Sequence, residues 1–168
     1  MNRRPHILFL ALVTLLLSAC GGSTIADEEH LLDGDRWNRF TPEHFDFAVD
    51  NIENYYNIDL TAAIDTTRFR YGELPVMLIL KSPGGEERQF YGAVVFKGKP
   101  SQDDQSARWR GEMKDGYRVA TGRIRSYFSF NHKGTHSLDV SQATSQYDLE
   151  GVHGISLTIT KAKVDYDF

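Results

Sequence analysis

The feature that most constrains the fold is an alternation of apolar and polar side chains with a period of two. In residues 56–64 the apolar members are Tyr56, Ile58, Leu60, Ala62 and Ile64. Residues 45–49 and 155–160 repeat this pattern. An extended chain turns every second side chain to the same side, so each segment predicts a β-strand with one buried face. No window of 11 or more residues shows the apolar stripe of an amphipathic helix.

Turn signals separate further strand-like segments. Residues 76–80 form a continuous apolar run, residues 82–86 read Ser-Pro-Gly-Gly-Glu, and residues 88–96 follow as the second arm of a hairpin. Residues 117–130 predict a long strand, residues 131–134 a turn, and residues 137–140 another strand. Residues 142–150 are expected to hold a short helical turn. About eight strands at this spacing predict an all-β domain, an antiparallel β-sandwich or jelly roll.

The N-terminus predicts export. Arg3 and Arg4 precede an apolar run over residues 7–17, 11 residues long. As a helix that run would measure roughly 16 Å, about half of what a hydrocarbon core requires, but it suits a signal peptide. The segment that follows, Leu17-Ser18-Ala19-Cys20-Gly21, looks like the lipobox of bacterial lipoproteins.

Cys20 is the only cysteine of the 168 residues, so no disulfide can form within the chain. We therefore expect residues 1–19 to be the signal peptide, Cys20 to carry the lipid, and residues 20–34 to be a lipidated, flexible tether. Residues 35–168 are then the sandwich domain. Several acyl chains on Cys20 would hold the protein to a membrane, most simply the outer membrane of the cell envelope.

The net charge of the chain restricts the classes of partner that it is expected to bind. The chain carries a formal charge of −4, and losing Arg3 and Arg4 with the signal peptide makes the mature chain more acidic. An acidic body does not favour nucleic acid, which needs clustered lysine and arginine, nor electrostatic attachment to anionic lipid. We expect contacts with other envelope proteins, and no small-molecule substrate or cofactor.

Known catalytic motifs are missing from the sequence. It has no P-loop, GxGxxG, GxSxG or HExxH pattern. His132 and His136 are four residues apart but flank a turn, so we expect solvent-exposed loop histidines and no metal site. The adjacent Asp103 and Asp104 fit a solvated loop better than a calcium site. Arg110, Arg118, Arg123 and Arg125 could form a basic strip, although a charged solvent-facing sheet is the more frequent arrangement.

Two tryptophans are the candidate contact residues. Trp37 and Trp109 both lie near predicted loops, where an exposed indole could stack on a sugar or anchor a protein partner. Trp109 belongs to the long loop-like stretch 97–116, and loops of that length often carry function.

The mature domain resembles the gliding-motility lipoproteins of the GldH family of Bacteroidetes. The resemblance rests on the lipobox and Trp37, the strands at 45–49 and 56–60, the aromatic entry into the apolar strand at 69–80, the turn at 82–85, and the closing segments 134–143 and 149–161. It covers most of residues 35–161, whereas residues 97–117 depart from the pattern. It implies a non-enzymatic envelope component linked to gliding or type IX secretion, with no catalytic residues.

Three functions remain open. The leading expectation is an assembly lipoprotein whose sandwich docks other envelope proteins. The second is a surface binding module for a glycan or protein, which would expose Trp37 or Trp109 beside a groove. The third is a hydrolase with carboxylates brought together from distant strands.

Overall fold

The computed structural model describes residues 23–98 and 108–163. Within these residues the chain forms an all-β sandwich of antiparallel strands and a 3₁₀ turn at Asp33–Asp35, with no α-helix. This described part of the chain therefore contains no helix long and apolar enough to cross a membrane. The strands are β1 (Thr24–Leu31), β2 (Arg36–Asn38), β3 (Glu43–Val49), β4 (Tyr56–Ile64), β5 (Glu73–Lys81), β6 (Glu87–Val95), β7 (Glu112–Lys114), β8 (Tyr117–Phe128), β9 (Gly134–Gln142), β10 (Asp148–Glu150) and β11 (Val152–Lys161).

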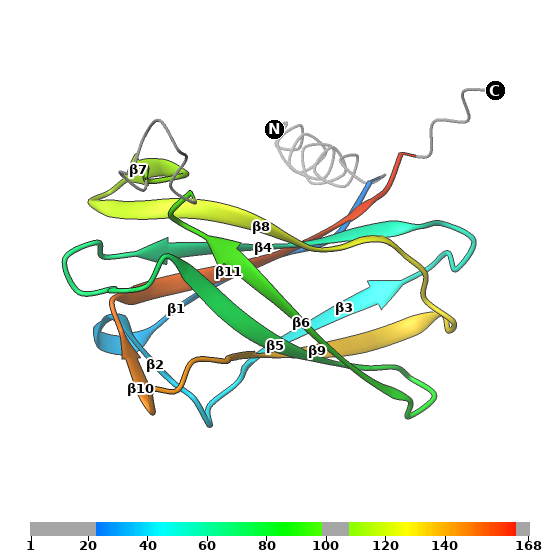
Figure 1. Ribbon diagram of the computed structural model, residues 1–168. Coiled ribbons are helices and arrows are strands. Elements are labelled where there is room, and N and C mark those ends of the chain that lie inside the picture. The colour runs from blue at the N-terminus through cyan, green and yellow to red at the C-terminus, as the bar shows by residue number, and fades with distance from the viewer. Residues whose placement is uncertain (1–22, 99–107, 164–168) are drawn as a thin grey trace, which may run out of the picture.

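Two sheets face each other, as Figure 1 shows. One has the strand order β1-β11-β4-β8-β7 and the other the order β3-β9-β5-β6. A small ladder of β2 and β10 closes one end. The predicted sandwich is thus confirmed, with four strands, β1, β2, β7 and β10, beyond the expected set.

The core lies between the sheets and follows the alternation in the sequence. β4 buries every second residue, and its bounds are those of the predicted segment 56–64. β5 is an inner strand of its sheet; its alternate residues Val76, Leu78 and Leu80 are buried. Met77 and Ile79 lie half-buried on its outer face. Ring contacts join the layers near one end, where Phe130 packs edge-on against Tyr56 and Phe47.

The sheets approach most closely at β6 and β8. A Cβ added to Gly122 of β8 would lie 2.4 Å from the Ala93 carbonyl oxygen of β6. Opposite this seam, His30 of β1 lies 2.8 Å from Glu43 of β3 and stacks on Phe45. Glycine on one side and an imidazole–carboxylate contact on the other therefore bring the edges of the two sheets together.

The tether prediction is wrong for residues 24–31, which form β1. This strand pairs with β11 along its whole length, so the backbone groups that face β11 are hydrogen-bonded within the sheet. Most of its side chains are exposed, and Asp27, Glu28 and Glu29 are typical of a sheet edge protected from aggregation by charge. Because β1 has one neighbouring strand and little burial, its sequence shows no strong alternation of apolar and polar side chains.

The helical turn predicted within residues 142–150 is also wrong. The buried Gln142 side chain organises this segment instead. Its amide donates to the Gln146 carbonyl at 2.7 Å, and its oxygen accepts from the Thr144 backbone and hydroxyl at 2.8 and 2.6 Å. These bonds replace helical ones, and the chain continues directly into β10.

Candidate functional site

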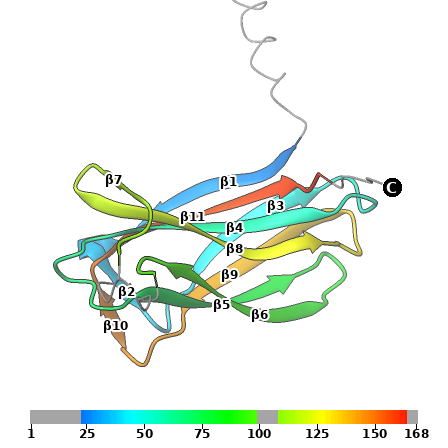
Figure 2. The ribbon, with the colours of Figure 1, turned by 45° about the horizontal axis from the view of Figure 1, so that its top comes forward.

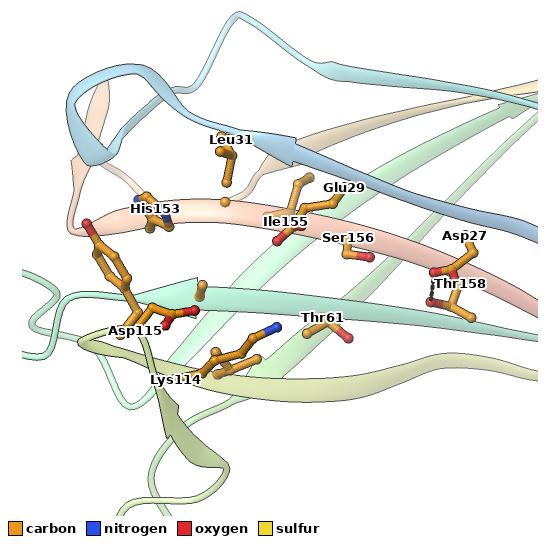
Figure 3. A pocket seen from close by; sticks show the side chains of 14 residues that line it. Asp27, Glu29, Leu31, Thr61, Lys114, Asp115, His153, Ile155, Ser156 and Thr158 are labelled. Carbon is orange, nitrogen blue, oxygen red and sulfur yellow. Dashed lines mark hydrogen bonds between the residues drawn. The ribbon is translucent and has the colours of Figure 1, made fainter.

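A broad hollow of the described surface lies on the outer face of the five-stranded sheet. It is a groove of about 490 Å³. β11 and β4 form its floor, β1 lies along one side, and the β7–β8 hairpin lies along the other (Figure 3). The strand order places this hairpin and β1 on either side of β11 and β4, and Figure 2 shows the same sheet turned by 45° from Figure 1.

Small side chains make the floor hollow. β11 contributes Gly154, Ser156 and Thr158, and β4 contributes Thr61 and Ala63. Their hydroxyls make the floor polar. Larger side chains at these outward-facing positions would fill the groove.

The sides of the groove carry exposed charges. Asp27 and Glu29 project from β1, and Lys114 and Asp115 come from the β7–β8 hairpin. The Thr158 hydroxyl donates to Asp27 at 3.4 Å. Three carboxylates against one ammonium make the groove acidic, because the only other titratable lining groups are Tyr117 and His153.

His153 lies at the end of the groove remote from Asp27 (Figure 3). Its Nδ1 is 2.6 Å from the Asp35 carboxylate, which also accepts a hydrogen bond of 3.2 Å from the Tyr117 hydroxyl. The rings of Tyr117 and His153 stack with centroids 3.8 Å apart. Partial burial and the nearby Asp35 charge raise the pKa of the Tyr117 hydroxyl above its usual value.

Backbone geometry positions Asp35 for this contact. Gly34 and Asp35 both adopt left-handed conformations, with φ of 66° and 54°. Glycine adopts such angles without strain, and aspartate is among the few other residues that tolerate them. Arg68 adds a cation 3.8 Å from the same carboxylate. The imidazole is thereby held in one orientation, with Nε2 left for an outside partner.

The groove presents hydroxyls and exposed carboxylates, which can form hydrogen bonds and ion pairs with a ligand. Ser156 lies further along β11, away from His153 (Figure 3). Glu29 and Asp115 are exposed to water, whereas a carboxyl that works as a general acid is usually buried so that its pKa rises. No group of three metal-ligating side chains occurs within residues 23–98 and 108–163.

The structure overturns one of the two predicted contact residues. Trp37 lies in β2, not in a loop, and is only 1% exposed. Its indole N–H donates to the Thr41 carbonyl at 3.3 Å, and its backbone pairs with Leu149 of β10. The indole closes the end of the core, so it cannot serve as an exposed platform.

Trp109 is partly exposed, but its ring already has partners. It forms an isolated β-bridge with Lys97, whose ammonium lies 4.4 Å from the ring centroid. The Arg118 guanidinium lies 5.9 Å from the same ring. Trp109 also packs against the core, and it does not line the groove.

The four arginines do not form a free basic strip. Arg123 is paired with Asp59, and Arg125 lies over the Phe90 ring at 4.7 Å while donating to the Tyr91 carbonyl. Arg118 lies beside Trp109, and Arg110 adjoins Gly98. Each cation serves a local contact in or near the β6–β8 seam.

The expectation of two exposed loop histidines fails for His136. Its side chain is buried, stacks on Phe47 and approaches the Gly134 carbonyl through Nδ1 at 3.1 Å. Burial lowers its pKa below 6.5. Cys20, Asp103 and Asp104 lie outside the residues that the structure describes.

Sequence reasoning missed the Asp35–Tyr117–His153 cluster and the charged hairpin. Asp35 and His153 are 118 residues apart and carry no local motif. The hairpin did have a signal, because Asp115-Gly116 is a typical type I′ turn pair, and both residues have positive φ, 50° and 88°.

A scan against models of known protein families finds no match to this chain, and a search of curated proteins finds none either. The GldH resemblance therefore remains a prediction from the sequence.

Proposed function

We propose that this protein is a lipid-anchored component of the bacterial cell envelope, similar to the GldH lipoproteins, that acts by binding and not by catalysis. The leader and the lipobox at Cys20 support the anchor. The groove supports binding, and it is the observation that carries the proposal. Gliding motility or type IX secretion is the process in which such a component would take part.

The partner we favour is an envelope protein that places a basic segment in the groove. Glu29 of β1 and Asp115 of the β7–β8 hairpin line the groove from separate elements, and their carboxylates have no partner within residues 23–98 and 108–163. Lysine or arginine side chains would pair with these carboxylates. The hydroxyls of the floor and Nε2 of His153 can bind the backbone of an extended segment.

Fatty-acid labelling tests the anchor. Cys20→Ala should abolish the label and release the protein from membranes, because no other residue can accept the thioether. Thr24→Ala, exposed and four residues further along, is the control and should keep both. A Cys20→Ala protein that stayed in the membrane fraction would refute the anchor.

Photo-crosslinking in cells tests the binding site. A photoreactive residue in place of Lys114 should crosslink to an envelope protein, whereas one in place of Tyr91, on the other sheet, should not. The charge-only variant Glu29→Gln/Asp115→Asn keeps size and turn geometry, and should weaken the crosslink increasingly as salt is lowered. An undiminished crosslink would contradict the electrostatic contact.

A surface module for a glycan is the second candidate. Exposed carboxylates and hydroxyls along a groove also suit sugar hydroxyls, and Leu31 at the rim, 66% exposed, offers an apolar contact. A glycan array should then give signals that resist salt but disappear with Asp115→Asn. A blank array together with a Lys114 crosslink favours the protein partner.

A further inference from the structure

We propose that the end of the sandwich at which β1 begins rests on the bilayer and inserts Ile52, Tyr55 and Tyr127 among the lipid headgroups. This inference depends on the proposed lipid anchor at Cys20. The occupant of the surface is thus the membrane that holds the acyl chains, and the surface sets the orientation of the domain on it.

Only a short length of chain separates Cys20 from the folded body. β1 begins at Thr24, and four residues span at most about 14 Å when fully extended. β1 is fixed to the body, because it pairs with β11 over its whole length and Ser23 accepts a hydrogen bond from the Lys161 amide. The acylated residue therefore holds this end of the sandwich, and no other, close to the headgroups.

The same end gathers exposed aromatic and apolar side chains. Thr24, Thr160, Asn57 and the end of β8 follow one another across the sheet. Tyr55 accepts a hydrogen bond from Ala162 through its carbonyl at 2.8 Å, and the Tyr127 amide donates to the Asn57 side chain at 3.3 Å. Tyr55 and Tyr127 are 45% and 57% exposed, and Ile52, in the β3–β4 loop, is 38% exposed.

Backbone strain supports a role for Tyr127. Its φ is 53°, in the left-handed region that bulky side chains avoid. The residue lies where an extra residue of β8 shifts the register against β4, between the pairs at Tyr56 and Ile58. This irregularity leaves the ring in solvent, although Phe128 beside it packs against the core. A ring kept out of the core at conformational cost indicates an external partner.

The exposed side chains at this end suit contact with lipid headgroups better than contact with water alone. Tyrosine favours the membrane–water interface, where its ring meets apolar chains and its hydroxyl meets water. Lys161 and Lys163 are exposed here and suit lipid phosphates, while Asp50 and Glu53 in the β3–β4 loop offset them. The contact is therefore aromatic and apolar more than electrostatic, as an acidic protein requires.

Spin labelling of the acylated protein tests the orientation. Cys20 is the only cysteine, so once it is acylated an added cysteine is the single free thiol. Ile52→Cys, Tyr55→Cys and Tyr127→Cys would each carry a nitroxide, with Tyr147→Cys as control. Tyr147 is 71% exposed and adjoins β10, at the end where β1 finishes. The labelled proteins are placed in phosphatidylcholine vesicles.

Nitroxides at 52, 55 and 127 should be more accessible to oxygen, which concentrates in lipid, than to a water-soluble nickel chelate; position 147 should show the reverse. If the protein floats with the vesicles but all four labels show the water pattern, the orientation is refuted and the anchor stands. If the acylated protein does not float, the anchor and the orientation both fail. Circular dichroism confirms that each variant is folded.

Discussion

At the scale of single residues, the two tryptophans show how burial decides a role. Trp37 closes the end of the core beneath the β2–β10 ladder. The cations of Lys97 and Arg118 lie over the ring of Trp109 at the surface. Both indoles stand near chain reversals in the sequence, so only the three-dimensional packing separates the structural one from the accessible one.

We expect Trp37→Ala to lower the free energy of unfolding by about 3–5 kcal/mol, because it removes a fully buried indole and leaves a cavity. Trp109→Ala is the matched control and should cost less, since its ring is partly exposed and contacts the core with one part only, beside cation–π contacts of about 0.5–1 kcal/mol each. Urea denaturation measures both. Equal losses would contradict the assignment of Trp37 to the core.

His30 predicts a pH dependence at the β1–β3 seam. Burial opposes its protonation, but hydrogen bonds to Glu28 and Glu43 outweigh burial and raise the pKa of the imidazole above 6.5. A pKa raised on folding adds stability that is complete below about pH 6.5 and is lost as the pH rises through the folded value. His30→Gln should therefore cost more stability at about pH 5.5 than at about pH 8.5.

Denaturation curves of wild type and His30→Gln at both pH values measure this difference. Comparing the two proteins cancels other titrations, including that of His136, whose lowered pKa acts in the opposite direction. A penalty independent of pH would show that the imidazolium does not stabilise the seam.

At the scale of elements, strands that alternate buried and exposed residues could be predicted, including the edge strand β3, whereas the exposed edge strand β1 could not. β4 and the β5–β6 hairpin follow from alternation and from the Pro-Gly-Gly turn. β1 could not be predicted, because it is held mainly by backbone pairing with β11 and none of its side chains is fully buried. The groove could not be predicted either, because its lining residues come from five strands, and only the order of the strands in the sheet brings them together.

The close approach of β6 and β8 gives a prediction for the seam between these elements. Gly122→Ala would place a Cβ 2.4 Å from the Ala93 carbonyl oxygen, so the strands must separate. We expect a loss of about 1–3 kcal/mol, as for other overpacked sites. Gly72→Ala is the control, because its added Cβ would meet only the Lys97 Cβ, at 3.6 Å. Thermal unfolding of both variants measures the difference, and similar midpoints would contradict a tight seam.

At the scale of the whole molecule, the two ends of the sandwich differ in what they expose. The end where β1 begins carries Ile52, Tyr55 and Tyr127, and the groove extends from Asp27 towards His153 at the other end. If the first end rests on lipid, His153 and the β7–β8 hairpin point away from the membrane. The groove would then be accessible to a partner that approaches from the aqueous side.

This arrangement requires β1 to belong to the folded body, which truncation can test. A chain starting at residue 32 lacks β1 and bares the edge of β11, whose backbone groups would lose their partners. It should unfold at lower urea concentration than a chain starting at residue 23 and should associate as its concentration rises, because the bared edge can pair with a second copy. Sedimentation at several concentrations measures association. Equal stability and a monomeric shortened chain would mean that β1 is a tether after all, and the short link between Cys20 and the body would no longer fix the orientation of the domain.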